Sequence, residues 1–158
     1  MDKQWYHYLS PAVRPWAKQS LQLLKQAKQQ RETVAYDNYD YIVFPLAKAY
    51  ETFLKDYLYA MHVIDEYTYN NKRCAIGRAL NPDVRLEQRD DWWLYDDLAQ
   101  TCGERVAREV WDTWLMRNKL MHLYPGEKQE TTLAQAEEKI QQFIRVIELC
   151  AVCGEKEY

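Results

Sequence analysis

The scarcity of turn residues is the feature that most constrains this fold. Glycine occurs four times and proline five times among 158 residues, together about 6%, roughly half of the usual share of about 12%. Sandwiches and barrels of β-strands need many turns, whereas few turns favour a handful of long helices. We therefore expect an all-α protein. Because 47% of the residues are hydrophobic, the chain can bury a core of its own, and we expect a single domain over residues 1–158.

Hydrophobic periodicity predicts a bundle of about five main helices with some short ones. The first begins at Ser10-Pro11, an N-cap followed by proline. The expected later helices cover residues 40–62, 92–101 and 104 to about 121 or 122, and the fifth follows Thr132 and Gln135, which form a capping box.

Smaller signals mark the boundaries of these helices. Asp90 or Asp91 is the expected cap of the third helix, and Gly103 is its expected end. We expect a short helix from Cys74 to Leu80, a loop over residues 85–89 and a turn over residues 124–126.

The net charge and the lack of long apolar segments limit which classes of protein this chain can belong to. The net charge is −3 and the isoelectric point is about 5.7, which excludes a generally basic nucleic-acid coat and leaves room only for a local basic patch. No run approaches the roughly 18 apolar residues of a membrane span, and the N-terminus lacks a signal-type apolar segment. We therefore expect a cytoplasmic protein without membrane contact, and reduced cysteines.

The spacing of the cysteines does not indicate a metal site. Cys150 and Cys153 form a CxxC pair, but a zinc site needs four ligands, and Cys74 and Cys102 stand alone. We expect structural, buried thiols. No Gly-rich phosphate loop and no Ser/His/Asp triad suggests itself. We expect no cofactor, and no metal, because His122 lacks a metal-ligand partner at i+4 spacing and no carboxylate cluster accompanies it.

The fourth predicted helix carries the sharpest anomaly. Val106, Val110 and Trp114 form an apolar stripe that Arg117 interrupts, and the neighbouring row breaks to polar at Asn118 and His122. A charge on such a face must be paired, bound to a ligand or placed at an interface. In the structural interpretation, the arginine extends from the bundle end and the histidine caps helix carbonyls; in the functional one, they form a site.

Two segments resemble one protein family. Arg117-Asn118-Lys119-Leu120-Met121-His122 matches the R-x4-6-H motif of the HEPN superfamily, with a polar residue directly after the arginine. The segment 49–55, Ala-Tyr-Glu-Thr-Phe-Leu-Lys, is similar to a helix in the HEPN domain of the RNase LS (RnlA-type) toxins of bacterial phage defence. The resemblance covers roughly residues 40–150. We expect no counterpart of the further N-terminal domains of those toxins.

The resemblance implies a metal-independent endoribonuclease, acting as a toxin or in phage defence. His122 would be the general base or acid, Arg117 would stabilise the phosphorane, and Asn118 would orient the phosphate or the histidine. Glu51, and Lys48 where the toxins typically have arginine, would assist from the second helix. The expected partners are RNA, a second copy of the chain and an antitoxin. The alternatives are a HEPN module that binds RNA, nucleotide or a partner protein without cleaving it, and a purely structural dimerisation domain.

Other aromatic and basic residues have a functional and a structural interpretation. Four aromatic residues could stack on bases, but aromatic residues in a bundle more often belong to the core: Tyr67, Tyr69, Trp92 and Trp93. Five basic residues could form a local basic surface, but a solvated loop is the default interpretation: Lys72, Arg73, Arg78, Arg85 and Arg89. His7 lies in an aromatic segment that is expected to dock on the bundle, and His62 is expected to close a helix.

Overall fold

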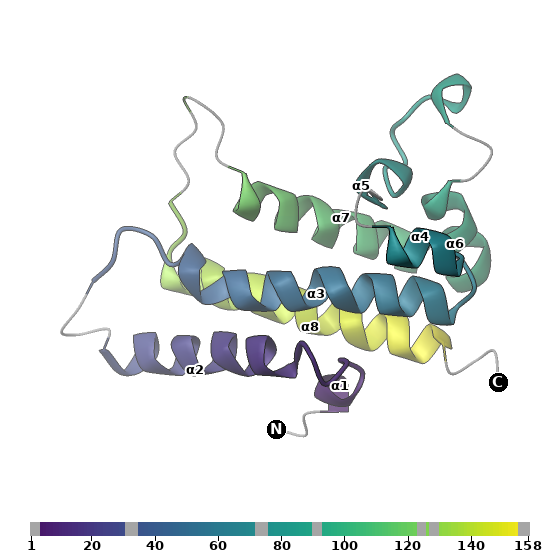
Figure 1. Ribbon diagram of the computed structural model, residues 1–158. Coiled ribbons are helices and arrows are strands. Elements are labelled where there is room, and N and C mark those ends of the chain that lie inside the picture. Colours follow the sequence, from purple (N-terminus) through teal and green to yellow (C-terminus); the bar gives the residue numbers. More distant parts are fainter. Residues whose placement is uncertain are drawn as a thin grey trace.

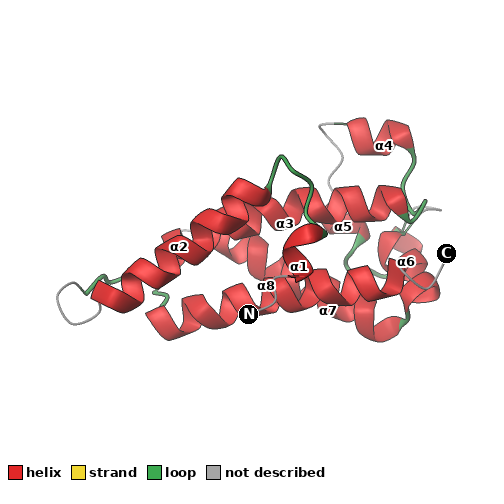
Figure 2. Ribbon diagram, turned by 90° about the horizontal axis from the view of Figure 1, so that it is seen from below, coloured by secondary structure: helices red, strands yellow, loops and turns green. Residues whose placement is uncertain are grey.

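The computed structural model describes residues 4–30, 35–71, 76–89, 93–122, 126 and 130–154. Within these ranges the protein contains helices and no strands (Figures 1 and 2). The all-α prediction is therefore confirmed. The elements are α1 (Gln4–His7), α2 (Arg14–Gln30), α3 (Asp40–Ala60), α4 (Glu66–Asn70), α5 (Ile76–Ala79), η1 (Leu86–Gln88), α6 (Leu94–Cys102), α7 (Glu104–Met121) and α8 (Leu133–Gly154). Among the described residues, no helix is long and apolar enough to cross a membrane.

Helix α3 lies at the centre of the bundle and packs against α2, α7 and α8. Helix α8 runs in the same direction as α3, whereas α2 and α7 run in the opposite direction (Figure 1). The core is built around Tyr50, which is fully buried, packs on Phe143 of α8 and donates its hydroxyl to the carbonyl of Val110 of α7 at 3.3 Å. This contact holds the three helices together next to the polar residues described below.

Several predicted boundaries are confirmed. Thr132 donates its backbone N–H to Gln135 Oε1 (2.9 Å), and the N–H of Gln135 reaches Thr132 Oγ1 (3.2 Å), so the capping box is formed in both directions. Gly103 adopts φ +89°, a conformation that favours glycine, between α6 and α7. The N-terminal segment docks as expected, because Trp5 and Leu9 are buried in the core.

Helix α2 starts later than the sequence predicts. Ser10 accepts hydrogen bonds from the N–H groups of Val13 and Arg14 in a turn, and the side chain of Arg14 holds the preceding loop through the carbonyls of His7 and Leu9. The Ser10-Pro11 prediction is therefore wrong by about one turn. Pro15 occupies the first turn of the observed helix, where proline costs no hydrogen bond.

The other differences concern short elements. Residues 85–89 contain the 3₁₀ helix η1 instead of an irregular loop, and α4 was not predicted at all. The third predicted helix begins at Leu94, with Trp93 as its N-cap. The proposed caps Asp90 and Asp91, together with residues 72–75, 92 and 123–125, lie outside the described residues.

Pro45 lies inside α3 and removes one backbone donor. The N–H of Leu46, the next residue, is satisfied from another helix, because it donates to Ser20 Oγ of α2 at 2.9 Å. Ser20 is completely buried, so this hydrogen bond ties α2 to α3 at the point where proline disturbs the helix.

Candidate active site

Arg117 lies in the last two turns of α7, on the side that faces α3. It follows the buried Trp114 by three residues and therefore shares its face of the helix. Its side chain is only 13% exposed. The sequence anomaly is thus a largely buried guanidinium, which needs partners.

Those partners come from α3 and from the neighbouring residue. Glu51 Oε2 accepts a charge-assisted hydrogen bond from Arg117 Nη2 and lies 3.3 Å from Nζ of Lys48, one turn earlier on α3. Arg117 Nη1 donates to Asn118 Oδ1 at 3.0 Å. Four of the five predicted site residues therefore form one connected group, which we call the arginine cluster: Lys48, Glu51, Arg117 and Asn118.

Trp114 supports the arginine cluster from within the core. The guanidinium carbon of Arg117 lies 5.2 Å from the centre of the Trp114 ring, a cation–π distance. The Trp114 indole in turn lies against Gly77 of α5, where an added Cβ would come within 2.3 Å of Nε1. Only glycine leaves room for this ring. Trp114 and Gly77 were not predicted as site residues; the i−3 spacing of Trp114 was a signal for the first, and nothing in the pattern indicates the second.

The arginine cluster carries two cations and one anion. Burial raises the pKa of the Glu51 carboxyl, but the charges and hydrogen bonds of Arg117 and Lys48 outweigh this effect and leave the pKa below its ordinary value. Glu51 is therefore ionised at neutral pH, and the cluster has a net charge of +1. Among the described residues, Arg117 Nε is buried without a hydrogen-bond partner. The net positive charge of the cluster, exposed through the ammonium of Lys48, suits an anionic ligand such as a phosphate.

His122 lies at the end of the same helix but not within these contacts. It is the C-cap of α7, its backbone N–H donates to the carbonyl of Asn118 at 3.1 Å, and its side chain is exposed. Five residues separate it from Arg117, about 140° around an ideal helix and about 7.5 Å along the axis. The ion pair and hydrogen bonds of the arginine cluster are made without His122.

The cysteines differ from the prediction of reduced thiols. Cys102 at the end of α6 and Cys153 at the end of α8 form a disulfide, with Cα atoms 5.6 Å apart, so the prediction is wrong for this pair. The two residues are 51 positions apart in the chain, and only the packing of the helices brings them together. Cys150 is a free, buried thiol, as expected, and Cys74 lies outside the described residues.

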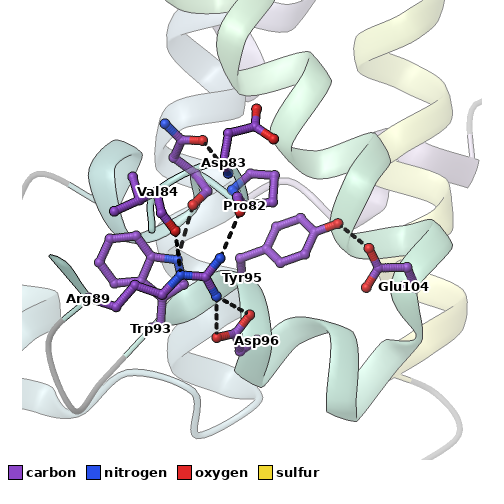
Figure 3. Close-up of polar contacts among 9 residues, drawn as sticks. Pro82, Asp83, Val84, Arg89, Trp93, Tyr95, Asp96 and Glu104 are labelled. Atoms are coloured by element: carbon purple, nitrogen blue, oxygen red, sulfur yellow. Dashed lines mark hydrogen bonds and ion pairs between the residues drawn. The ribbon is translucent and has the colours of Figure 1, made fainter. Parts of the chain in front are cut away.

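Arg89, in the basic loop before α6, makes contacts that stabilise the fold (Figure 3). Arg89 donates to the carbonyls of Pro82 (2.7 Å) and Val84 (2.9 Å), and its Nη1 donates to both carboxylate oxygens of Asp96. Its guanidinium also lies 5.4 Å from the centre of the buried Trp93 ring. Arg89 therefore fastens the loop to α6 instead of offering a free cation, and Trp93 belongs to the core. Arg78 and Arg85 are exposed, whereas Lys72, Arg73 and Trp92 lie outside the described residues.

Two tyrosines and one histidine remain among the candidate residues: Tyr67, Tyr69 and His62. Tyr69 stacks on Tyr59 and donates its hydroxyl to Asp56 at 2.7 Å, and Tyr67 is exposed on α4. His62 follows the end of α3 with φ +55°. No group of three or more His, Cys, Asp or Glu side chains within the described ranges is arranged to hold a metal ion.

Comparison of the chain with protein-family models, with curated proteins and with solved structures finds no match in any of the three.

Proposed function

We propose that this protein is a metal-independent endoribonuclease of HEPN type, acting as a toxin or in phage defence. The observation that carries the proposal is the arginine cluster itself. Lys48 and Glu51 of α3 meet Arg117 and Asn118 of α7, although 66 positions separate Glu51 from Arg117. These are the residues that the sequence resemblance assigns to a ribonuclease site.

The reaction uses the RNA's own 2′-hydroxyl as nucleophile. O2′ attacks the adjacent phosphorus and loses its proton to a general base, while the bond from phosphorus to O5′ breaks and O5′ takes a proton from a general acid. Histidine serves either role near neutral pH, and His122 is the proposed residue. The products are a 2′,3′-cyclic phosphate and a 5′-hydroxyl, and neither a metal nor a cofactor is required.

The arginine cluster would bind the reacting phosphate. The fork of Arg117 suits the phosphate oxygens, on which negative charge develops in the transition state. Glu51 and the ring of Trp114 hold the guanidinium in place, Asn118 orients it or the phosphate, and the exposed ammonium of Lys48 adds a second cation.

A second copy of the chain would complete the site. Within one ideal helix Arg117 and His122 point in different directions, so a two-fold contact at the end of α7 offers a way to face one copy's arginine with its partner's histidine. The exposed Leu115 on the same helix supports such a contact. We propose a homodimer in the cytoplasm, restrained by an antitoxin protein. In that compartment the disulfide between Cys102 and Cys153 is an exception, because cytosolic thiols are normally kept reduced.

One observation favours a binding module without catalysis. Glu51 already neutralises the guanidinium of Arg117, which is largely buried, as in a purely structural ion pair. A domain of this kind would hold RNA, a nucleotide or a partner protein through the exposed Lys48 and would leave the bound molecule intact.

Cleavage of labelled RNA by the purified protein separates these functions. Arg117→Ala is expected to reduce the rate by about 10²–10³-fold, and His122→Ala by about 10²–10⁴-fold. The matched controls are Arg105→Ala, an exposed arginine at the other end of α7, and His7→Ala, an exposed histidine on α1; both should retain full activity. EDTA should not change the rate. RNA binding without cleavage would support the second function, and equal losses in the control variants would refute the assigned roles.

A further inference from the structure

A group of exposed aromatic rings lies at the beginning of α3, which leads to the arginine cluster. The three rings are those of Tyr36 (49% exposed), Tyr41 (37%) and Phe44 (38%), and we call them the aromatic face. Large aromatic side chains are usually buried because each carries a large apolar surface. Three such rings in one place therefore need an explanation that the core does not supply.

The two tyrosine rings of the aromatic face are held in place. The rings of Tyr36 and Tyr41 meet edge to face, with their centres 5.7 Å apart, and both contact the buried Tyr39. Tyr39 is fixed in turn, since its N–H donates to the carbonyl of Thr131 at 2.9 Å and its hydroxyl accepts from the N–H of Tyr36. The tyrosine part of the face is therefore preorganised, which lowers the entropy lost when a ligand binds.

The aromatic face is continuous with the proposed phosphate-binding residues. Tyr41, Phe44 and Lys48 follow one another at i, i+3 and i+7 along one side of α3, so that Phe44 lies about 6 Å and Tyr41 about 10 Å from Lys48 along the axis. Helix α7 runs opposite to α3 (Figure 1), and its Arg117 contacts Glu51 near the middle of α3. The part of α7 after Arg117 therefore lies toward the beginning of α3. The end of α7 that carries His122 thus lies toward the end of α3 that carries the rings.

The charges along this side of α3 suit an anionic strand. Lys48 is exposed and Lys55 is half-buried on the same side, and Glu51 between them is neutralised by the arginine cluster. Of the nearby carboxylates, Asp40 is buried and paired with Lys139 at 3.0 Å. Asp37 is exposed beside Tyr36, and Glu137, which pairs with Lys28, lines the same hollow as Tyr36 and Asp37; both lie at the end remote from Lys48. Rings followed by cations on one side of a helix match a strand that alternates bases and phosphates.

We propose that the aromatic face is a base-stacking platform that binds single-stranded RNA next to the arginine cluster. The proposal rests on the proposed function for the identity of the ligand and assigns the substrate class: unpaired RNA, with its bases stacked on Tyr36, Tyr41 and Phe44 and a phosphate at Lys48 and Arg117. Stacking is tolerant of sequence, because every base has a π-face. The platform therefore selects unpaired over paired RNA and shows little base preference.

Fluorescence anisotropy with a labelled single-stranded RNA of about twelve nucleotides tests the platform. His122→Ala is the parent protein, so that the probe stays intact. Tyr41→Ala and Phe44→Ala are each expected to weaken binding about 5- to 30-fold, the lower half of the range for loss of one stacked base, and Tyr41→Phe should bind like the parent. Tyr67→Ala, which removes a 78% exposed ring from α4, is the matched control and should change nothing. The same RNA as a duplex should bind more weakly than the single strand.

The outcomes distinguish this proposal from the proposed function. Unchanged binding in Tyr41→Ala and Phe44→Ala overturns the platform, and the cleavage assay still decides the enzyme. RNA binding that depends on both rings, in a protein that cleaves no RNA, supports the platform and refutes the nuclease. If both variants turn a dimer into a monomer without changing RNA affinity, the face binds a second copy of the chain and the platform is wrong.

Discussion

Replacing Glu51 by glutamine is expected to destabilise the protein more than removing the arginine that it binds. Glu51→Gln keeps the shape of the side chain but leaves the largely buried guanidinium of Arg117 without its counter-ion. Arg117→Met removes the buried charge and keeps an apolar stem over Trp114. Glu51 then still has Lys48 as a partner, 3.3 Å away. The two substitutions therefore break the same ion pair with unequal consequences.

The contacts of both residues set the size of this difference. Removing one partner of a fully buried pair costs about 3–5 kcal/mol, and a hydrogen bond to a charged group contributes about 1.5–3 kcal/mol. Because both side chains keep some exposure, we expect Glu51→Gln to lower the free energy of unfolding by about 1–3 kcal/mol. Arg117→Met loses a cation–π contact but gains a sulfur–aromatic one and no longer buries a charge, so its effect should stay within about 1 kcal/mol.

Urea denaturation followed by far-UV circular dichroism measures both variants without using tryptophan fluorescence, which a change beside Trp114 would disturb. In thermal unfolding, about 2 kcal/mol corresponds to a fall in melting temperature of about 4–8 °C for a chain of this length. The control is Arg105→Met, which replaces an exposed arginine on the same helix. If Arg117→Met is the more destabilising variant, Arg117 is a structural residue, and the argument that its charge is retained for a ligand fails.

Gly77→Ala should destabilise the protein by about 1–3 kcal/mol, because the new Cβ would overlap the Trp114 indole; a variant with wild-type melting temperature would refute this close packing. The pKa of Glu51 is lowered in the folded protein, so its ionised carboxylate stabilises the fold above the ordinary glutamate pKa, and this contribution is lost as the pH falls through the folded-state pKa. The difference in unfolding free energy between wild type and Glu51→Gln should therefore shrink as the pH drops from about 6 to below about 4. A difference that stays constant would contradict this. Reducing the disulfide between Cys102 and Cys153 should lower the free energy of unfolding by up to about 4 kcal/mol, as chain entropy predicts for their separation of 51 residues. Cys102→Ala should have the same stability as the reduced protein. An unchanged melting temperature after complete reduction would show that the bond does not stabilise the fold.

Helices with strong local signals were predictable from the sequence. The hydrophobic periodicity that predicts a helix over residues 40–62 and the capping box of Thr132 and Gln135 depend on residues close together in the chain, and the structure agrees with both. The start of α2 was missed because the side chain of Arg14 stabilises a turn where an N-cap pattern predicts a helix. The disulfide was missed because it depends on how α6 and α8 pack, which periodicity does not show.

The candidate site was predictable only in part. Periodicity marked Arg117 as a charge on an apolar face, but Glu51 and Lys48 came from the family resemblance and not from any pattern. The support from Trp114 is a contact within α7, which its spacing of three residues from Arg117 could have indicated. The space left by Gly77 is a tertiary contact between α5 and α7, and no local signal indicates it. The exposure of the aromatic face was not predicted, because aromatic residues in a helical bundle usually belong to the core.

The chemistry of the cleaved RNA ends tests the proposed nuclease most directly. RNA cut by the wild-type protein in the presence of EDTA should carry a 2′,3′-cyclic phosphate and a 5′-hydroxyl, as mass spectrometry of the fragments can show. The same RNA with a single 2′-deoxy nucleotide at the cut site should bind, remain intact at that bond and inhibit the reaction. Cleavage of the 2′-deoxy RNA at this bond would mean that water or a protein group is the nucleophile, and it would contradict the roles proposed for Arg117 and His122.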